Sequence, residues 1–249
     1  MSKELEREFK KSGIFIYKNS NVIKTESLKT KVKVHLSEKD KVRILEADYA
    51  LLAIGVTGNI ENSGIENIGI ISEDGSIKVN KYNQTNIPNI YAIGDVSGSP
   101  WLAHVASAQG AVSVEHAFED IAETIDYNNI PGCTYTQPQV GSIGLTERVA
   151  LSKGFSIKVG KYSFRSNGKA MAVGHNDGFI KLIFDEKYGE LLGAHIIGSE
   201  ATELIGQLSM AKALESTWED LAFGVFAHPT FSEAIMEAAL DAYDIGIHQ

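Results

Sequence analysis

The chain has 249 residues, of which 43% are hydrophobic and 22% charged, and it carries a formal net charge of −9. This composition is typical of a globular protein with one large or two smaller domains. The negative charge argues against nucleic acid and anionic membranes as partners, and no stretch approaches the ~20 consecutive apolar residues of a membrane helix. The charged N-terminus is unlike a signal peptide. Because one cysteine allows neither an internal disulfide nor a cysteine-rich metal site, we expect a reducing compartment, most simply a cytoplasm, and no metal centre.

The first part of the chain predicts a helix, a strand and a hairpin. Residues 2–11 have apolar positions at helical spacing, and a glycine follows them as a stop signal. Residues 14–17 are a short apolar run that we expect to form a strand. Residues 30–36 and 41–46 alternate apolar and polar side chains on either side of a charged turn, which predicts a hairpin with one solvent-facing side.

An unbroken apolar run from Tyr49 to Gly55 suits a strand that is buried on both faces. A glycine directly after such a strand is usually a turn, and it is also a position where the backbone approaches a nucleotide. On the residues alone we favour the turn for Gly55. Residues 58–89 are rich in Asn, Gly and Ser, which predicts loops, short strands and a crossing between two domains.

A short strand is predicted over residues 87–95, and it ends in a glycine and an acid. Ligands of open α/β sheets bind beyond the carboxyl ends of strands, so the Asp95 carboxylate is placed to accept hydrogen bonds from hydroxyl groups. An Asx turn or a helix cap is an equally good interpretation of this aspartate. Residues 101–123 predict a helix with small side chains along one side, which suits either a flat ligand or tight packing on a sheet. The N–H groups of its first turn would favour negative charge on such a ligand.

From about residue 128 the composition changes, and we expect an α+β domain with an antiparallel sheet. Residues 179–184 and 191–197 flank a polar turn, which predicts a hairpin. Residues 201–214 predict a long helix with one apolar stripe. The pair Asn167-Gly168 is typical of a tight turn, although its flanking residues alternate poorly.

The segment with the clearest chemistry lies near the C-terminus, where His228-Pro229 precedes a helix that contains Glu233. Pro229 favours extended backbone at His228, which holds the imidazole off the helix, and the carboxylate lies in the first helical turn. The two side chains are within reach of a hydrogen bond, and a histidine held by a carboxylate is a general base with a fixed tautomer. The alternative is a capping box, Thr230-x-x-Glu233, in which the glutamate has no chemical role, and the spacing alone favours this cap.

Three stretches, in matching order and spacing, resemble the dihydrolipoamide dehydrogenases, a family of flavoprotein pyridine nucleotide-disulfide oxidoreductases. Residues 227–240 resemble the C-terminal His-Pro-Thr-x-Ser-Glu signature of that family. Residues 90–104 resemble its second flavin-binding motif, and residues 132–147 resemble the opening of its interface domain. The likeness covers nearly the whole chain. It implies a partial FAD- and NAD-binding Rossmann-like α/β region followed by an α+β dimerisation domain with an antiparallel sheet.

The resemblance divides the chain into the C-terminal part of an NAD-binding domain (1–80), the C-terminal part of a FAD-binding domain (81–128) and a whole interface domain (129–249). It implies a contact between Gly55 and NAD, although the Arg-Arg-Pro that often follows this glycine in relatives is absent. It also implies a set of residues at the flavin. That set is Asp95, Trp101, Leu102, Ala103 and His104.

The resemblance further implies a reaction and partners. His228 would take a proton from dihydrolipoamide and Glu233 would hold the imidazole, while electrons pass through a reactive disulfide and FAD to NAD+. In this family the His–Glu pair serves the flavin and disulfide of the other subunit, which implies a homodimer. The other implied partner is the lipoyl-bearing acyltransferase subunit of a 2-oxoacid dehydrogenase complex, in a cytoplasm or a mitochondrial matrix.

Parts of such an enzyme are missing from the sequence. It contains no Gly-x-Gly-x-x-Gly and no pair of cysteines, so neither a pyrophosphate-binding loop nor a redox disulfide is present. We therefore interpret the chain as the C-terminal portion of the enzyme, inactive with dihydrolipoamide and poor at binding FAD on its own. The alternatives are a non-catalytic dimerisation module that pairs with a separate N-terminal half, and another reductase such as glutathione reductase or soluble transhydrogenase.

Overall fold

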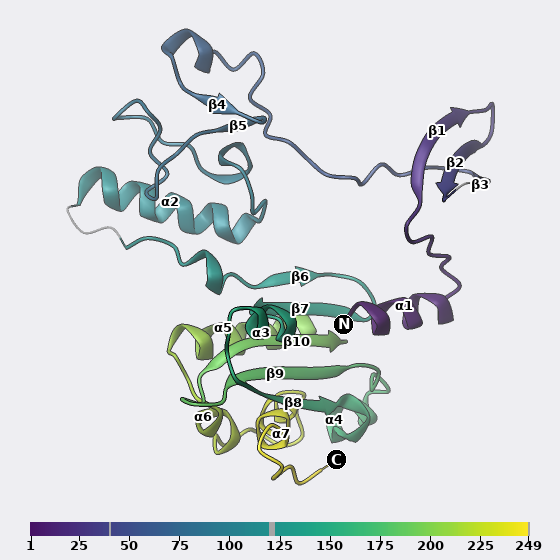
Figure 1. Cartoon of the computed structure of the whole chain (residues 1–249), viewed down its shortest axis with the longest axis vertical. Coiled ribbons are helices and arrows are strands. Elements are labelled where there is room, and N and C mark those ends of the chain that lie inside the picture. The colour runs from purple at the N-terminus through teal and green to yellow at the C-terminus, as the bar shows by residue number, and fades with distance from the viewer. Residues whose placement is uncertain (40, 120–122, 249) are drawn as a thin grey trace. The chain divides into compact units, whose positions relative to one another are not determined.

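The computed structural model describes residues 1–39, 41–119 and 123–248. The chain forms two compact units (Figure 1). The C-terminal unit comprises Met1–Phe15 and Asp126–Gln249, and the middle unit comprises Ile16–Ile125. The domain limits predicted above refer to the cofactor-binding domains of a family rather than to compact units, and they remain predictions.

The C-terminal unit is built on a five-stranded antiparallel sheet with the strand order β6-β7-β10-β9-β8. Its strands are β6 (Gly132–Thr134), β7 (Gln139–Gly144), β8 (Ile157–Ser163), β9 (Phe179–Asp185) and β10 (Leu191–Gly198). Its α-helices are α1 (Ser2–Lys11), α3 (Glu147–Ser152), α4 (Gly168–Ala172), α5 (Ala201–Ala213), α6 (Trp218–Ala222) and α7 (Glu233–Asp241). Its short 3-10 helices are η3 (Tyr127–Asn129) and η4 (Phe164–Ser166). The predicted antiparallel α+β domain, its hairpin and its long helix are thereby confirmed.

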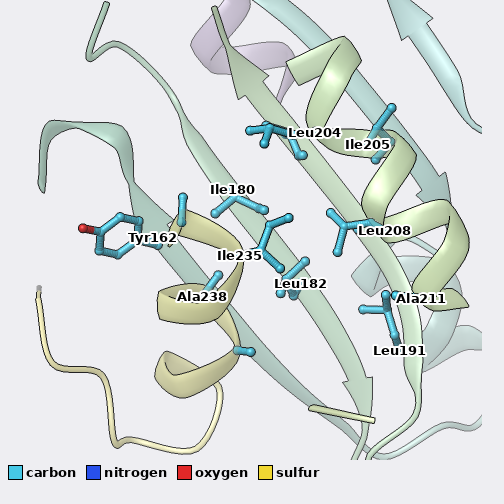
Figure 2. Close-up of a cluster of buried hydrophobic side chains, with 14 of the residues drawn as sticks. Tyr162, Ile180, Leu182, Leu191, Leu204, Ile205, Leu208, Ala211, Ile235 and Ala238 are labelled. Atoms are coloured by element: carbon cyan, nitrogen blue, oxygen red, sulfur yellow. The ribbon is translucent and has the colours of Figure 1, made fainter. Parts of the chain in front are cut away.

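The core of this unit lies between the sheet and the helices α5 and α7 (Figure 2). Leu204, Ile205 and Leu208 of α5 are buried, as the apolar stripe of the predicted helix requires. Together with Ile235 of α7 and Leu182 of β9 they belong to one buried cluster. Burial of one such side chain contributes about 1.5–3 kcal/mol, so this cluster determines where α7 lies on the sheet.

Helix α7 also approaches strand β8 closely. A Cβ atom added to Gly160 would lie 1.7 Å from the carbonyl oxygen of Ala238, so no residue with a side chain fits at this position without displacement of the helix. The absence of a side chain therefore lets α7 rest directly on the strand. Because α7 begins at Glu233, this contact fixes the distance between that residue and the sheet.

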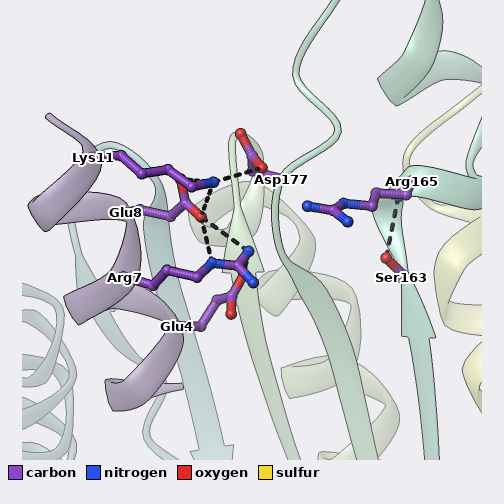
Figure 3. Close-up of polar contacts among 7 residues, drawn as sticks. All are labelled: Glu4, Arg7, Glu8, Lys11, Ser163, Arg165 and Asp177. Carbon is purple, nitrogen blue, oxygen red and sulfur yellow. Dashed lines mark hydrogen bonds and ion pairs between the residues drawn. The ribbon is translucent and has the colours of Figure 1, made fainter.

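Helix α1 belongs to the C-terminal unit, and it carries a cluster of charged side chains that reaches Asp177 (Figure 3). The Glu8 carboxylate accepts hydrogen bonds from Lys11 Nζ at 2.8 Å and from Arg7 Nε at 3.0 Å. Lys11 Nζ also lies 3.8 Å from Asp177, and Arg7 pairs with Glu4. The hydrogen bond from Lys11, together with that from Arg7, outweighs the effect of burial and holds the pKa of Glu8 below its ordinary value. The predicted helix is thus confirmed.

The middle unit contains two small antiparallel sheets and one long helix. The larger sheet has the order β1-β2-β3, from the strands β1 (Asn21–Ser27), β2 (Val32–Glu38) and β3 (Lys41–Ala47). The other elements are η1 (Ile65–Ile68), β4 (Ser72–Glu73), β5 (Ser76–Ile77), η2 (Gly94–Ser97) and α2 (Ala103–Phe118). The predicted hairpin is confirmed as β2 and β3. The sequence did not predict β1, because its apolar residues are adjacent and do not alternate.

Two apolar segments predicted as strands are not strands. Residues 14–17 and 49–55 form no strand, and the side chain of Leu51 in the second segment is 93% exposed. A strand requires a neighbouring strand that satisfies its backbone N–H and C=O groups. None of the sheets in the described residues includes either segment, so apolar composition alone does not make them strands.

Three further predictions need correction. Residues 87–95 form no strand, and an isolated bridge joins Gln84 to Tyr91 instead. The helix predicted over 101–123 ends at Phe118, and part of its predicted end, residues 120–122, lies outside the described residues. Asn167 is not in a hairpin turn, because its side chain accepts a hydrogen bond from the Ala170 N–H and caps the helix α4. Asparagine is favoured in turns and also at the N-cap position of a helix, which explains the wrong prediction.

Candidate functional site

The structure brings His228 and Glu233 together. Nδ1 of His228 lies 2.8 Å from Oε1 of Glu233, which is the first residue of α7. When Nδ1–H donates to the carboxylate, Nε2 is the ring nitrogen left to accept a proton. The His228 side chain is 76% exposed and the Glu233 side chain 20% exposed. The imidazole is therefore accessible, while the carboxylate that holds it is sheltered.

The second oxygen of this carboxylate contacts the backbone, as the capping interpretation expects. Oε2 of Glu233 accepts a hydrogen bond from the Thr230 N–H at 2.8 Å. The Thr230 hydroxyl does not complete a capping box, because it donates to the carbonyl oxygen of Ala227 at 2.7 Å. One carboxylate thus holds both the imidazole and the loop. The predicted capping box does not form, because α7 begins at Glu233 with Ser232, and not Thr230, at its N-cap.

Contacts from other elements hold the rest of the loop. The ring of Phe231 packs edge-on against that of Phe164, with 5.7 Å between the ring centroids, and Phe164 is fully buried. Nε2 of Gln207, on α5, donates to the Ser232 hydroxyl at 2.9 Å. The loop is thereby attached to the core on one side and to α5 on the other.

Electrostatics favour a charged carboxylate beside the imidazole. Burial raises the pKa of Glu233, but the hydrogen bonds from the Thr230 N–H and from His228 outweigh it, so the pKa lies below its ordinary value. A carboxylate that is ionised at neutral pH stabilises an imidazolium next to it. Burial, together with the charges of Glu237 and Glu233, raises the pKa of Tyr162 to about 12, so this neighbouring phenol stays neutral.

A second imidazole–carboxylate pair follows one helical turn later. Glu237 is 3% exposed, and its Oε1 lies 2.6 Å from Nδ1 of His248. Its other oxygen accepts the backbone N–H groups of Ile247 and His248 at 3.3 and 3.2 Å. This pair attaches the end of the described chain to α7, and the sequence pattern did not indicate it.

The residues expected at a flavin lie in the middle unit, around the start of α2. The Gly94 N–H donates to Oε1 of Gln109 at 2.7 Å, which ties the η2 segment to the helix. All of the expected residues except Leu102, which is half-buried, are exposed. They are Asp95, Trp101, Leu102, Ala103 and His104.

This end of α2 fits one side of a flavin. Gly94 has a φ of +71°, and a Cβ there would lie 3.3 Å from the Cβ of Ala106, so the backbone turn sits directly on the helix. The carboxylate of Asp95 is exposed and could accept hydrogen bonds from a hydroxylated chain, and the start of the helix offers N–H groups to an electron-rich ring. That these residues contact a flavin stays a prediction.

The surroundings of Gly55 are different. Its φ is +136°, a conformation that favours glycine, and a Cβ at this position would meet nothing within 4 Å. The neighbouring apolar residues are exposed as well. The described residues around Gly55 therefore form no cradle for a nucleotide, and its contact with NAD stays a prediction.

Sequence reasoning missed two buried amides that hold these segments. Gln109 is 4% exposed and supports Gly94, and Asn167 is 2% exposed and contacts the His228 loop. A polar residue among small and apolar ones was the available signal for Gln109. No group of His, Cys, Asp and Glu side chains suited to a metal ion occurs in the described residues. Over the same residues, no helix is both long enough and apolar enough to cross a bilayer.

Comparisons with known proteins agree on one family. Residues 130–239 match the family model described as pyridine nucleotide-disulphide oxidoreductase, dimerisation domain, and residues 1–110 match the model described as pyridine nucleotide-disulphide oxidoreductase. A dihydrolipoyl dehydrogenase of Rhizobium etli is 45% identical over 240 residues, which are 95% of this chain and 50% of that protein. The dihydrolipoyl dehydrogenase of Bacillus subtilis is 40% identical over an alignment of 250 positions, which covers 100% of this chain and 53% of that protein. The chain thus spans about half the length of the curated relatives it matches.

Solved structures confirm the predicted fold class. LpdA from Mycobacterium tuberculosis has a TM-score of 0.86 and 27% identity, over 94% of this chain and 51% of that one. The HOCl-induced flavoprotein disulfide reductase RclA from Escherichia coli has a TM-score of 0.89 over 95% of this chain and 54% of that one. At 24% identity the second likeness shows the fold alone. The matched family uses FAD and NAD as cofactors.

Proposed function

We propose, from the premise that this chain belongs to the pyridine nucleotide-disulphide oxidoreductase family, that it supplies the general base and the dimer-forming part of a dihydrolipoyl dehydrogenase. The observation that carries the proposal is the 2.8 Å contact between Nδ1 of the exposed His228 and Oε1 of Glu233. Relatives at 40–45% identity that are named dihydrolipoyl dehydrogenase favour this activity over glutathione reductase and soluble transhydrogenase.

The proposed chemistry is proton removal from sulfur. A thiol has a pKa of about 8.5 and is mostly protonated at neutral pH. Nε2 of His228 accepts the proton of one dihydrolipoamide thiol, and the thiolate attacks a sulfur of the enzyme's disulfide, whose S–S bond breaks as a mixed disulfide forms. The second substrate thiol attacks the substrate sulfur of this mixed disulfide, closes the lipoamide S–S bond and passes its proton to the enzyme sulfur that it displaces, so both enzyme sulfurs are reduced. Glu233 stabilises the imidazolium, because its carboxylate is charged at neutral pH.

The disulfide and the cofactors complete the proposal. Cys133 is the single cysteine among the 249 residues, so the reactive disulfide comes from another chain segment or another chain. Bound FAD supplies two-electron oxidation of the reduced enzyme sulfurs, and NAD+ is the final electron acceptor. Asp95 would hold the hydroxylated chain of the flavin, and the first turn of α2, with Ala103 and His104, would face its ring.

The proposed partners follow from the same family. The match of residues 130–239 to a dimerisation domain supports a homodimer in which His228 serves the disulfide of the partner subunit. The dithiol substrate is carried by the lipoyl-bearing acyltransferase subunit of a 2-oxoacid dehydrogenase complex. The proposed location is a cytoplasm, or a mitochondrial matrix in a eukaryote.

A chimera tests this proposal. The matching segment of the Bacillus subtilis relative is replaced by this chain, and NADH formation from dihydrolipoamide and NAD+ is measured. We expect the chimera to be active, and we expect His228→Ala to lower kcat by about 10²–10⁴-fold, because that is the usual contribution of a general base. Glu233→Gln should lower it less, since the imidazole keeps a hydrogen-bond partner and loses the adjacent charge.

The matched control is His175→Ala, which removes an exposed imidazole of the same unit that lies outside the proposed machinery. It should leave kcat unchanged. An active chimera that keeps its full rate with His228→Ala would contradict the proposed role of this residue.

The single cysteine also predicts how the chain behaves in isolation. The 249-residue chain on its own should give no lipoamide-dependent NADH and should bind FAD weakly. Steady NADH formation by the purified chain would contradict the need for a disulfide from elsewhere.

A further inference from the structure

We propose that Asn167 is a positioning residue that sets the geometry of the His228–Glu233 pair. Its side chain is 2% exposed and uses both ends of the amide. Nδ2 donates to the carbonyl oxygen of Thr230 at 2.9 Å, and Oδ1 accepts the Ala170 N–H at 2.9 Å. One amide thus joins the start of α4 to the loop that carries the imidazole, across 63 residues of sequence.

A continuous series of hydrogen bonds runs from this amide to the base. Asn167 holds the carbonyl of Thr230, and the N–H of Thr230 donates to Oε2 of Glu233 at 2.8 Å. Oε1 of the same carboxylate lies 2.8 Å from Nδ1 of His228. The imidazole is 76% exposed, so packing contributes little to its orientation and these hydrogen bonds determine it.

The position of Asn167 is itself fixed by the core. Its backbone N–H donates to the carbonyl of Phe164 at 3.1 Å, and Phe164 is fully buried. The hydroxyl of the neutral Tyr162 donates to the carbonyl of Ser166 at 2.7 Å. The next residue, Gly168, lies against the base, since a Cβ there would be 3.9 Å from Cε1 of His228. The first turn of α4 is therefore held by the core and lies close to the imidazole of His228.

Capping of α4 alone does not require an asparagine. Ser and Asp are as good as Asn at the N-cap position, because a side-chain oxygen is sufficient there. An amide also supplies a donor, and Thr230 uses that donor. This difference separates the two roles of Asn167 experimentally, because Asp and Ser keep the cap and lose the donor to the loop.

The test uses NMR on the 249-residue chain without substrate or cofactor. In Asn167→Asp the carboxylate cannot donate to Thr230, and in Asn167→Ser the side chain is too short to reach it. Both variants should change the ¹⁵N shifts of the His228 ring. Both should also raise the pKa of Glu233, followed by the ¹³C shift of its carboxyl, by about half a unit or more, because the Thr230 N–H then holds the carboxylate less well.

The serine variant adds no charge, so a rise that both variants share does not come from the new carboxylate in Asn167→Asp. The matched control is Thr146→Ala, which removes a helix cap elsewhere in the unit, where Oγ1 of Thr146 accepts the Val149 N–H at 3.3 Å. Its melting temperature should fall, while the signals of His228 and Glu233 should stay as in the wild type. A purely structural role for Asn167 would give the same result as this control.

Unchanged His228 shifts and an unchanged Glu233 pKa in the serine variant would overturn the proposal, and this variant decides the question if Asn167→Asp does not fold. The catalytic consequence rests on the proposed function: in the chimera, Asn167→Ser should lower kcat about tenfold with little change in KM. An inactive chimera with altered NMR signals would contradict the proposed function and leave the positioning role intact. An active chimera with unchanged signals would contradict the positioning role alone.

Discussion

The two units use apolar runs of similar composition in opposite ways. In the C-terminal unit every residue of β10 is buried, and the strand pairs with β7 on one edge and β9 on the other. In the middle unit, residues 49–55 are exposed and belong to none of the sheets in the described part of the chain. The comparison shows that an apolar run becomes a buried strand only where neighbouring strands satisfy its backbone and helices cover its faces.

The same contrast separates the candidate site residues. His228 and Glu233 are held by a loop and helix that pack on the buried C-terminal core, and each hydrogen bond of the pair can be traced back to that core. Gly55 stands in an exposed segment, and a Cβ at its position would meet none of the described residues within 4 Å. The C-terminal unit, which has the larger buried core, therefore holds its candidate site residues in a more defined geometry. Substitutions in this unit should have the largest effects.

Leu182→Ala should cause the largest loss of stability. This side chain is fully buried in β9 and belongs to the cluster between the sheet and helices α5 and α7 (Figure 2). Truncation of a buried leucine costs about 2–5 kcal/mol, from the lost transfer free energy and the cavity that remains. Urea unfolding, followed by a signal of the C-terminal unit, measures the change. A loss below about 1 kcal/mol would mean that this sheet is not the rigid part of the molecule.

Gly160→Ala should have the next largest effect. The new methyl group would lie 1.7 Å from the carbonyl oxygen of Ala238, and backbone at that position cannot move without displacing α7. Overpacking of this kind costs about 1–3 kcal/mol of unfolding free energy. Because α7 carries Glu233, the substitution should also change the ¹⁵N shifts of the His228 ring.

The matched control for that substitution is Gly206→Ala. Gly206 lies on the exposed side of α5, and a Cβ there would meet nothing within 4 Å. Because alanine favours a helix interior over glycine, this variant should be about 0.5–1 kcal/mol more stable than the wild type. Equal destabilisation by both substitutions would show that the contact between β8 and α7 is not specific.

Much of the C-terminal unit could be predicted from the sequence, because its signals are local and its partners are close in the chain. The apolar runs of residues 179–184 and 191–197 and the polar turn between them predicted β9 and β10, which pair with each other. The apolar stripe of residues 201–214 predicted α5 and its buried side. Prediction failed for residues 49–55, because periodicity reports which side chains are apolar and not whether another strand is present.

The candidate site could likewise be predicted only where its signals are local. A loop that ends in His228-Pro229 and a helix that begins near Glu233 indicated the pair, since both features are local. The spacing could not decide whether Glu233 supports a base or caps the helix. In the structure its carboxylate contacts both the His228 imidazole and the Thr230 N–H. Asn167 was not predicted as part of the site, because its contact to Thr230 spans 63 residues and no pattern in a single sequence indicates such a hydrogen bond.

Leu51→Ala should have the smallest effect, and it is the direct counterpart of Leu182→Ala. The two side chains are the same, but one is 93% exposed and the other fully buried. Because an exposed side chain loses little surface on folding, we expect a change in unfolding free energy within about 0.5 kcal/mol. Urea unfolding of the two variants under the same conditions measures the difference. A loss above about 1 kcal/mol for Leu51→Ala would mean that residues 49–55 are packed in solution, and the contrast between the two units would then disappear for this segment.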